Sequence, residues 1–106
     1  MTSATYKLLR KAIRQKLQIV ATYDGHLREL CPHVLGIKHA RQQALFYQFG
    51  GTSSSGPLVP DSPDNWRCIP VDGLSDVRIR SGPWHTSGNY VNPQTCVDEI
   101  DVRVAL

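Results

Sequence analysis

The chain has few cysteines and no long apolar run, and each absence removes a class of protein. Three cysteines among 106 residues form an odd and sparse set, which is a poor disulfide framework, so we expect reduced thiols. No apolar run approaches the roughly 20 residues that a membrane helix needs, and the N-terminus lacks the short apolar core of a secretory signal. We therefore predict a cytoplasmic protein that has no membrane partner.

Charged residues are not abundant, and their distribution is uneven. Hydrophobic residues make up 41% of the chain and charged residues 20%, which is ordinary for a globular protein and argues against global disorder. A chain of this length forms one core, so residues 1–106 are predicted to be a single domain. The net charge of +3 is too small to prove a polyanionic partner. No acid precedes Asp24, however, and the N-terminal end is therefore electropositive.

An amphipathic helix is predicted over residues 5–16, and Thr2, Ser3 or Thr5 can cap its start. Its apolar positions recur at three- and four-residue spacing: Tyr6, Leu9, Ile13 and Leu17. Its cations share a neighbouring face: Lys7, Arg10, Lys11 and Arg14. Two interpretations of this basic face stay open. It is either a solvated surface on a helix that covers the core, or a surface that contacts the phosphates of a nucleic acid.

Short strands and turns follow the helix. Strands are expected at residues 18–23, 27–35, 44–49, 66–71, 74–80 and 96–104. Polar connections are expected at residues 36–42, 50–65 and 81–95. Asp24 and Gly25 form a two-residue hairpin turn, and Pro32 makes the second strand bulged, bent or peripheral. One helix followed by five or six strands predicts a mainly β fold: a small SH3-like or Sm-like barrel over about residues 17–80, with a C-terminal extension.

Four motifs in order resemble those of the WYL domain. They are Leu9-x-x-Ala12-Ile13 before a strand that ends in Tyr23, Arg28-x-x-x-Pro32 with Leu35-Gly36, Leu45-Phe46-Tyr47, and Arg67-Cys68-Ile69-Pro70-Val71-Asp72-Gly73-Leu74. WYL domains are Sm-type barrels of bacterial regulators, usually found behind a DNA-binding helix-turn-helix domain. The resemblance covers about residues 9–80 and implies a stand-alone sensor of a nucleotide or single-stranded nucleic acid. Gly73 stands where the family has an arginine, and the aromatic motif is rearranged.

The resemblance implies that Tyr23, Arg28 and Arg67 contact the ligand. Guanidinium groups grip phosphate through paired hydrogen bonds, and aromatic rings such as those of Tyr23, Tyr47 and Trp66 could stack on bases. The alternative is a structural role for the two arginines, in salt bridges with neighbouring acids: Glu29, Asp72 or Asp76.

Sulfur and imidazole side chains raise the alternative of a zinc site formed by Cys31, His33, Cys68 and Cys96. Cys31 and His33 alternate onto one face of a strand, and neighbouring strands could bring the other two cysteines close. The paired knuckles of structural zinc modules are absent, and free cysteines are commonly buried small hydrophobes. No cofactor is therefore expected, with zinc kept as an alternative.

The sequence thus favours a non-catalytic regulatory barrel that recognises a nucleotide or single-stranded nucleic acid through an arginine and tyrosine groove. An enzyme is not expected, because no orienting acid or nucleophile elbow accompanies Cys31 and His33. A protein-interaction module is the main alternative, with a second copy or a regulatory protein paired to an edge strand. A zinc-stabilised domain is the other.

Overall fold

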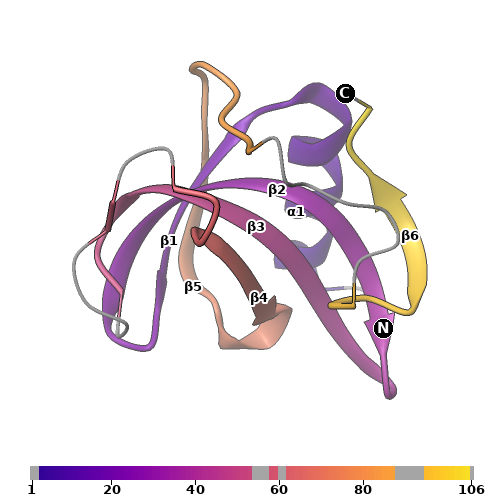
Figure 1. Cartoon of the computed structure of the whole chain (residues 1–106). Coiled ribbons are helices and arrows are strands. Elements are labelled where there is room, and N and C mark those ends of the chain that lie inside the picture. The colour runs from indigo at the N-terminus through magenta and orange to yellow at the C-terminus, as the bar shows by residue number, and fades with distance from the viewer. Residues whose placement is uncertain (1–2, 54–57, 60–61, 88–94, 106) are drawn as a thin grey trace.

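A computed structural model describes residues 3–53, 58–59, 62–87 and 95–105 as one helix followed by a six-stranded antiparallel sheet (Figure 1). The elements are α1 (Ala4–Gln15), β1 (Gln18–Tyr23), β2 (His26–Lys38), β3 (Arg41–Gly51), β4 (Trp66–Pro70), the single 3-10 turn η1 (Val71–Gly73), β5 (Ser75–Arg80) and β6 (Glu99–Arg103). The predicted mainly β class is confirmed. The curved sheet does not close completely among the described residues, since β4 and β5 form the two ends of its path.

Helix α1 begins and ends within one residue of its predicted limits. The Ser3 hydroxyl accepts a hydrogen bond from the Tyr6 backbone N–H at 3.0 Å, which caps the first turn. Lys16, with a φ of 52°, ends the helix in the left-handed conformation. The buried face packs into the main core through Tyr6, Leu9, Ala12 and Ile13. No helix in the described part of the chain is long and apolar enough to cross a membrane.

Strand β2 is the longest strand and holds the sheet together. One of its edges pairs with β3, whereas the other pairs with β1 over residues 26–30 and then with β6 over residues 34–37. The register with β3 shifts between Pro32 and Val34, because proline has no N–H to donate to the ladder. The irregularity predicted at Pro32 is confirmed, and it lies where β2 changes partners.

Gly36 allows β6 to approach β2 closely. A Cβ atom at this position would lie 2.0 Å from the Glu99 carbonyl oxygen and 2.6 Å from Val97 Cγ1. We expect Gly36→Ala to lower the free energy of unfolding by about 1–3 kcal/mol, because the strands must separate to admit the methyl group. Chemical denaturation measures the loss, and hydrogen exchange should locate it in β6 while the β1–β2 hairpin keeps its protection. Unchanged protection of β6 would contradict this account.

The polar connection predicted over residues 36–42 is wrong, since β2 continues to Lys38 and β3 begins at Arg41. The two strands are joined by His39 and Ala40, whose φ angles are 50° and 62°. A two-residue turn with positive φ at both positions normally carries asparagine, aspartate or glycine. His39 and Ala40 are not among these residue types, so the sequence does not predict the β2–β3 hairpin.

The prediction of reduced cysteines is also wrong for two of the three. Cys68 on β4 and Cys96 form a disulfide with their Cα atoms 5.6 Å apart. Cys96 reaches β4 because it packs with Val97 against Val34 and Leu45 in a small second core. The remaining cysteine, Cys31, is free and buried, and burial raises the pKa of its thiol to about 11.

Candidate ligand site

The inner face of the sheet is the face that packs into the main core. It carries apolar side chains and, in β2 and β4, two arginines. Its apolar part belongs to the main core and includes Ile19, Ala21, Leu30, Phe46 and Ile69. Arg28 is the cross-strand partner of Ala21, and Arg67 is the partner of Phe46. Directly opposed residues of antiparallel strands project from the same face. Both predicted arginines therefore extend the core face, and the structure puts them on the same side of the sheet.

Arg28 is buried, with only 3% of its surface exposed. Its Nε donates to the Tyr23 carbonyl oxygen and its Nη1 to Gln48 Oε1, both at 3.3 Å, and its guanidinium lies 5.1 Å from the centre of the Tyr23 ring. Gln48 is held in turn by donating to the carbonyl oxygens of Gly50 and Thr52. These partners are neutral, so they satisfy hydrogen bonds without neutralising the charge of Arg28.

Arg67 lies close enough to Arg28 to oppose its charge. Burial, and then the positive charge of Arg67, lower the pKa of Arg28 below its ordinary value. Arg67 Nη1 donates to the carbonyl oxygens of Asp64 and Trp66, at 2.9 and 3.0 Å. Its Nε is buried and makes no hydrogen bond to the described residues. Arg28 and Arg67 thus keep their positive charge, and Arg67 Nε keeps an unused hydrogen-bond donor within the described residues.

Neither arginine forms a salt bridge within the described part of the chain, although the Asp24 carboxylate acts on Arg28 from a greater distance. Among the described residues, no carboxylate lies within salt-bridge distance of Arg28 or Arg67. Glu29, the nearest candidate in sequence, pairs instead with Arg80, at 2.5 Å. Two neighbouring guanidinium groups without a carboxylate are the arrangement that accepts a phosphate or a carboxylate from a ligand. We define Tyr23, Arg28, Gln48 and Arg67 as the arginine cluster.

Gly73 provides space for the aromatic wall of the arginine cluster. A Cβ atom at this position would lie 2.9 Å from Tyr23 Cε1. The absence of a side chain at Gly73 therefore lets the Tyr23 ring lie against the η1 turn. A side chain at this position would displace the ring that Arg28 covers.

Tyr47 and Trp66, the other predicted ligand contacts, lie on the outer face of the sheet. They are cross-strand partners whose rings are 5.1 Å apart. The Tyr47 hydroxyl donates to the Ser62 carbonyl oxygen at 2.8 Å, and Trp66 packs edge-on against His33 at 4.7 Å. The structure does not bring these two rings together with the arginines, because adjacent residues on a strand project to opposite faces.

The four candidate zinc ligands are not assembled into a metal site. Cys68 and Cys96 are bonded to each other, so neither supplies a thiolate in this state. His33 is fully buried, and its ring nitrogens hydrogen-bond to the Cys31 carbonyl oxygen at 2.8 Å and to Thr86 Oγ1 at 2.9 Å. Over the ranges that the structure describes, no group of three or more His, Cys, Asp or Glu side chains could hold a metal ion.

The basic face of α1 is exposed except at one ion pair. Arg10 Nη2 lies 2.6 Å from Asp101 Oδ2, which also accepts a hydrogen bond from the Tyr6 hydroxyl at 2.7 Å. Burial and Asp101 raise the pKa of Tyr6 to about 12, and this network attaches α1 to β6. Three cations are exposed and outside the salt bridges of the described residues: Lys7, Lys11 and Arg14.

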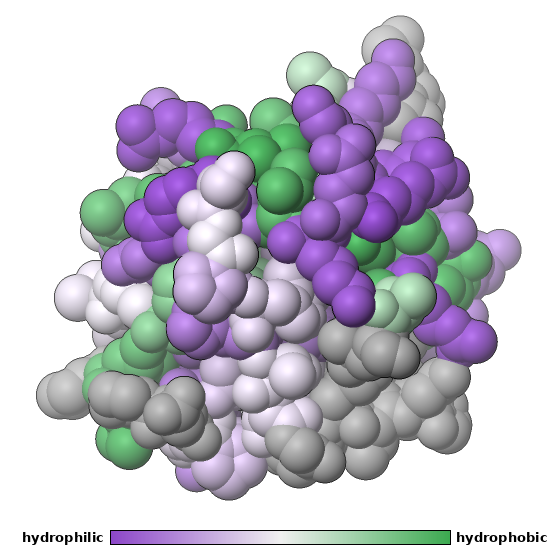
Figure 2. Space-filling model, turned by 90° about the horizontal axis from the view of Figure 1, so that it is seen from above, coloured by the Kyte–Doolittle hydropathy of each residue, from purple (hydrophilic) through white to green (hydrophobic). Residues whose placement is uncertain are grey.

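The described surface offers little to an apolar partner. Its exposed large hydrophobic residues lie on separate segments: Leu27, Val59 and Ile100. Figure 2 shows one face of the molecule, on which hydrophobic residues form small patches between hydrophilic side chains. A stable protein interface normally requires a larger continuous apolar area.

Comparisons of the chain with protein-family models, with curated proteins and with solved structures find no match. The resemblance to WYL domains therefore rests on the sequence motifs alone. The arginine cluster is interpreted from its own geometry and charge.

Proposed function

We propose that the chain is a non-catalytic ligand-binding barrel that takes a phosphate group between Arg28 and Arg67. The observation that carries the proposal is a pair of guanidinium groups on one face of the sheet with no carboxylate within salt-bridge distance among the described residues, one of them 3% exposed. A phosphate would offset their repulsion and form charge-assisted hydrogen bonds with both. The Tyr23 ring, which Arg28 already covers, would give the base of a nucleotide a surface to stack on.

A nucleotide or a single-stranded nucleic acid is the ligand class that this chemistry fits, and the WYL resemblance implies the same class. The exposed cations of α1, Lys7, Lys11 and Arg14, would contact additional phosphates of a longer strand. A role without catalysis is supported by Cys31, because burial raises its pKa to about 11 and leaves little thiolate at neutral pH.

A regulatory role in the cytoplasm is the context that the resemblance implies for this binding. The Cys68–Cys96 disulfide weighs against a cytoplasmic location, because disulfides persist mainly in oxidising compartments. Assembly through the edges of β4 or β5 is the second candidate function. The scattered positions of Leu27, Val59 and Ile100 favour ligand binding over assembly through an apolar surface.

The test is a titration of the intact protein with a nucleoside monophosphate and with a short single-stranded oligonucleotide, at low and at physiological salt. We expect saturable binding that weakens as salt rises. Arg28→Gln combined with Arg67→Gln should lower the affinity by at least about a hundredfold, since each hydrogen bond to a charged group is worth about 1.5–3 kcal/mol.

The control removes the same charge from exposed positions elsewhere. Arg78 on β5 and Arg103 on β6 are both exposed, and Arg78→Gln with Arg103→Gln should change nucleotide affinity by no more than about twofold. Circular dichroism and thermal unfolding of both double variants separate lost binding from lost folding. The absence of saturable binding by the wild-type protein at low salt, or equal losses in the two variants, would refute the proposed function.

A further inference from the structure

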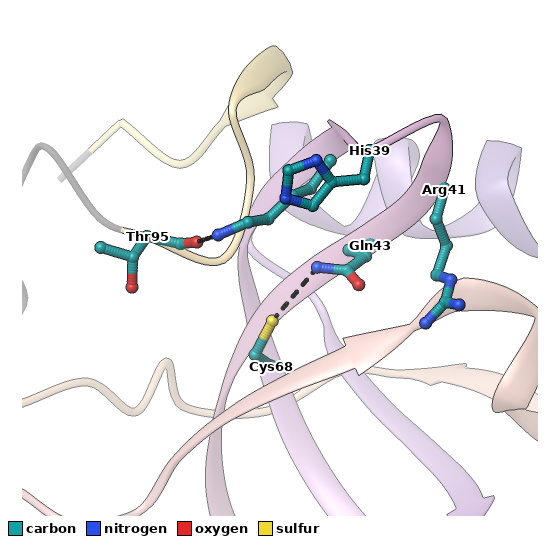
Figure 3. Close-up of a pocket in the computed structure, with 6 residues that line it drawn as sticks. His39, Arg41, Gln43, Cys68 and Thr95 are labelled. Atoms are coloured by element: carbon teal, nitrogen blue, oxygen red, sulfur yellow. Dashed lines mark hydrogen bonds between the residues drawn. The ribbon is translucent and has the colours of Figure 1, made fainter.

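A small pocket beside the Cys68–Cys96 disulfide is surrounded by cationic side chains. Its volume is about 310 Å³, and it is lined by Lys38, His39, Arg41, Gln43, Cys68 and Thr95. Figure 3 shows these side chains around the tip of the β2–β3 hairpin, with Gln43 directed toward the Cys68 sulfur. No carboxylate is among the described residues that line the pocket. We call it the disulfide pocket, and its charge favours an anionic occupant.

The hairpin tip that forms the disulfide pocket combines like charges with positive φ angles. Lys38 and Arg41 are directly opposed across the strands, and like charges in this position destabilise an antiparallel pair. His39 and Ala40 both have positive φ angles, 50° and 62°, which residues with a Cβ atom rarely adopt. Neither Lys38 nor Arg41 belongs to the salt bridges of the described residues, and Lys38 Nζ donates to the Thr95 carbonyl oxygen, which leaves its charge without a counter-ion there. Backbone strain and like charge are frequently retained at ligand sites.

The two cysteine residues of the disulfide are not equally exposed. Cys68 is exposed, whereas Cys96 has 6% of its surface exposed. Gln43 Nε2 lies 3.5 Å from Cys68 Sγ and donates to the Cys96 carbonyl oxygen at 2.7 Å, so it holds the side of the disulfide that faces the pocket. A nucleophile that arrives from solvent therefore meets Cys68 Sγ, and Cys96 becomes the leaving group.

We propose that the disulfide pocket recruits small thiols that carry carboxylate groups and that these open the disulfide at Cys68. The incoming thiolate attacks Cys68 Sγ, a new sulfur–sulfur bond forms to Cys68, and the bond between Cys68 and Cys96 breaks. Cys96 leaves as a thiolate and takes a proton from water. One disulfide is lost and one is formed, so the acidic thiol is the only co-reactant.

The two cations of the pocket have two effects on the incoming molecule. A positive potential raises the fraction of a thiol that is ionised to the reactive thiolate. It also raises the local concentration of a molecule that carries a carboxylate. Lys38 and Arg41 supply both effects next to Cys68. This inference does not depend on the arginine cluster, because none of its four residues lines the disulfide pocket.

Exchange at Cys68 would free Cys96, and the segment that leads from it into β6, from the covalent link to β4. Cys96 and Val97 pack against Val34 and Leu45 and lead into β6. Without the disulfide, this segment keeps those contacts, the pairing of β6 with β2 and the Asp101 bonds that attach β6 to α1, but it loses its one covalent link to β4. The path β4-β3-β2-β1-β5 contains no residue of the released segment. An acidic thiol would therefore loosen the C-terminal segment and leave the rest of the sheet intact.

The test compares three small monothiols of different charge: mercaptoacetate, 2-mercaptoethanol and cysteamine. Each is mixed with the oxidised protein, the reaction is quenched with acid, and the products are measured by mass spectrometry. Each rate constant is divided by that of the same thiol with an uncharged small disulfide, which removes differences in intrinsic nucleophilicity. We expect the normalised rate of mercaptoacetate to exceed that of cysteamine about tenfold at low salt, with little difference in about 1 M salt.

Two matched variants and a peptide map complete the test. Lys38→Gln with Arg41→Gln should abolish the preference for the anionic thiol. Lys16→Gln with Arg78→Gln makes the same change of charge at exposed positions outside the pocket and should retain the preference. Peptide mapping should find the first adduct on Cys68. Equal normalised rates for the three thiols with the wild-type protein, or a first adduct on Cys96, would overturn the proposal whether or not the variants fold.

Discussion

Cys68→Ala combined with Cys96→Ala is expected to lower the free energy of unfolding by about 3.5 kcal/mol. The disulfide joins residues 28 positions apart, and closing a loop of that length in the unfolded chain accounts for roughly this amount. For a domain of 106 residues, such a change is a large share of a total stability of about 5–15 kcal/mol. Urea denaturation followed by circular dichroism measures it.

Reduction of the wild-type protein supplies the control for this variant. Cys96 is buried in the small core with Val34 and Val97, so its replacement by alanine also removes some packing. A dithiol reductant opens the disulfide and leaves the packing atoms in place. The denaturation midpoint of the reduced wild-type protein should therefore lie below that of the oxidised protein and no lower than that of the variant. Equal midpoints for the oxidised and reduced wild-type proteins would contradict the expected contribution of the disulfide.

Acidification from pH 6.5 to pH 4 is expected to lower stability by up to about 3 kcal/mol through His33 alone. Burial lowers the pKa of His33 from its ordinary value of 6.5 to about 4. Between these values the unfolded state binds a proton that the folded state does not, so stability falls as the pH falls. Below about pH 4 both states are protonated at this residue, and its effect no longer changes with pH.

His33→Gln tests the assignment of this pH dependence. The variant should be less stable than the wild type at pH 7, because it loses the hydrogen bonds to Cys31 and Thr86. It should also lose most of the slope between pH 6.5 and pH 4. Asp101 acts at lower pH, since Arg10 and Tyr6 hold its pKa below the ordinary 3.8. A wild-type stability that stays level from pH 6.5 to pH 4 would refute the role of His33.

Local patterns were sufficient for α1, β1 and the first hairpin. The cap at Ser3, the spacing of the buried residues and the Asp24-Gly25 turn are all encoded within a few positions. The arginine cluster was predicted in part. Arg28 and Arg67 were named as candidate ligand contacts, and the structure puts both on one face of the sheet, whereas Gln48 was missed. Its signal was present, because Gln48 follows the core residue Phe46 by two positions and must share its face.

Other features depended on tertiary contacts that no local pattern encodes. The disulfide required Cys96 to return to β4 from a stretch without periodicity. The His39-Ala40 turn has positive φ angles at both residues, and histidine and alanine do not predict such angles. The separation of Tyr47 and Trp66 from the arginines, by contrast, follows from strand alternation once the register of β3 with β4 is known.

The division of one β2 edge between β1 and β6 has a consequence for the order of folding. Pairing of β1 with β2 joins residues that are neighbours along the chain, as in Tyr23 and His26. Pairing of β6 with β2 joins distant residues, as in Val34 and Arg103. Because distant contacts require the larger loss of chain entropy before they form, we expect the β1–β2 hairpin to form before β6 docks beside it. The C-terminal segment is thus expected to join the sheet late, when Val104 completes the main core and Asp101 binds α1.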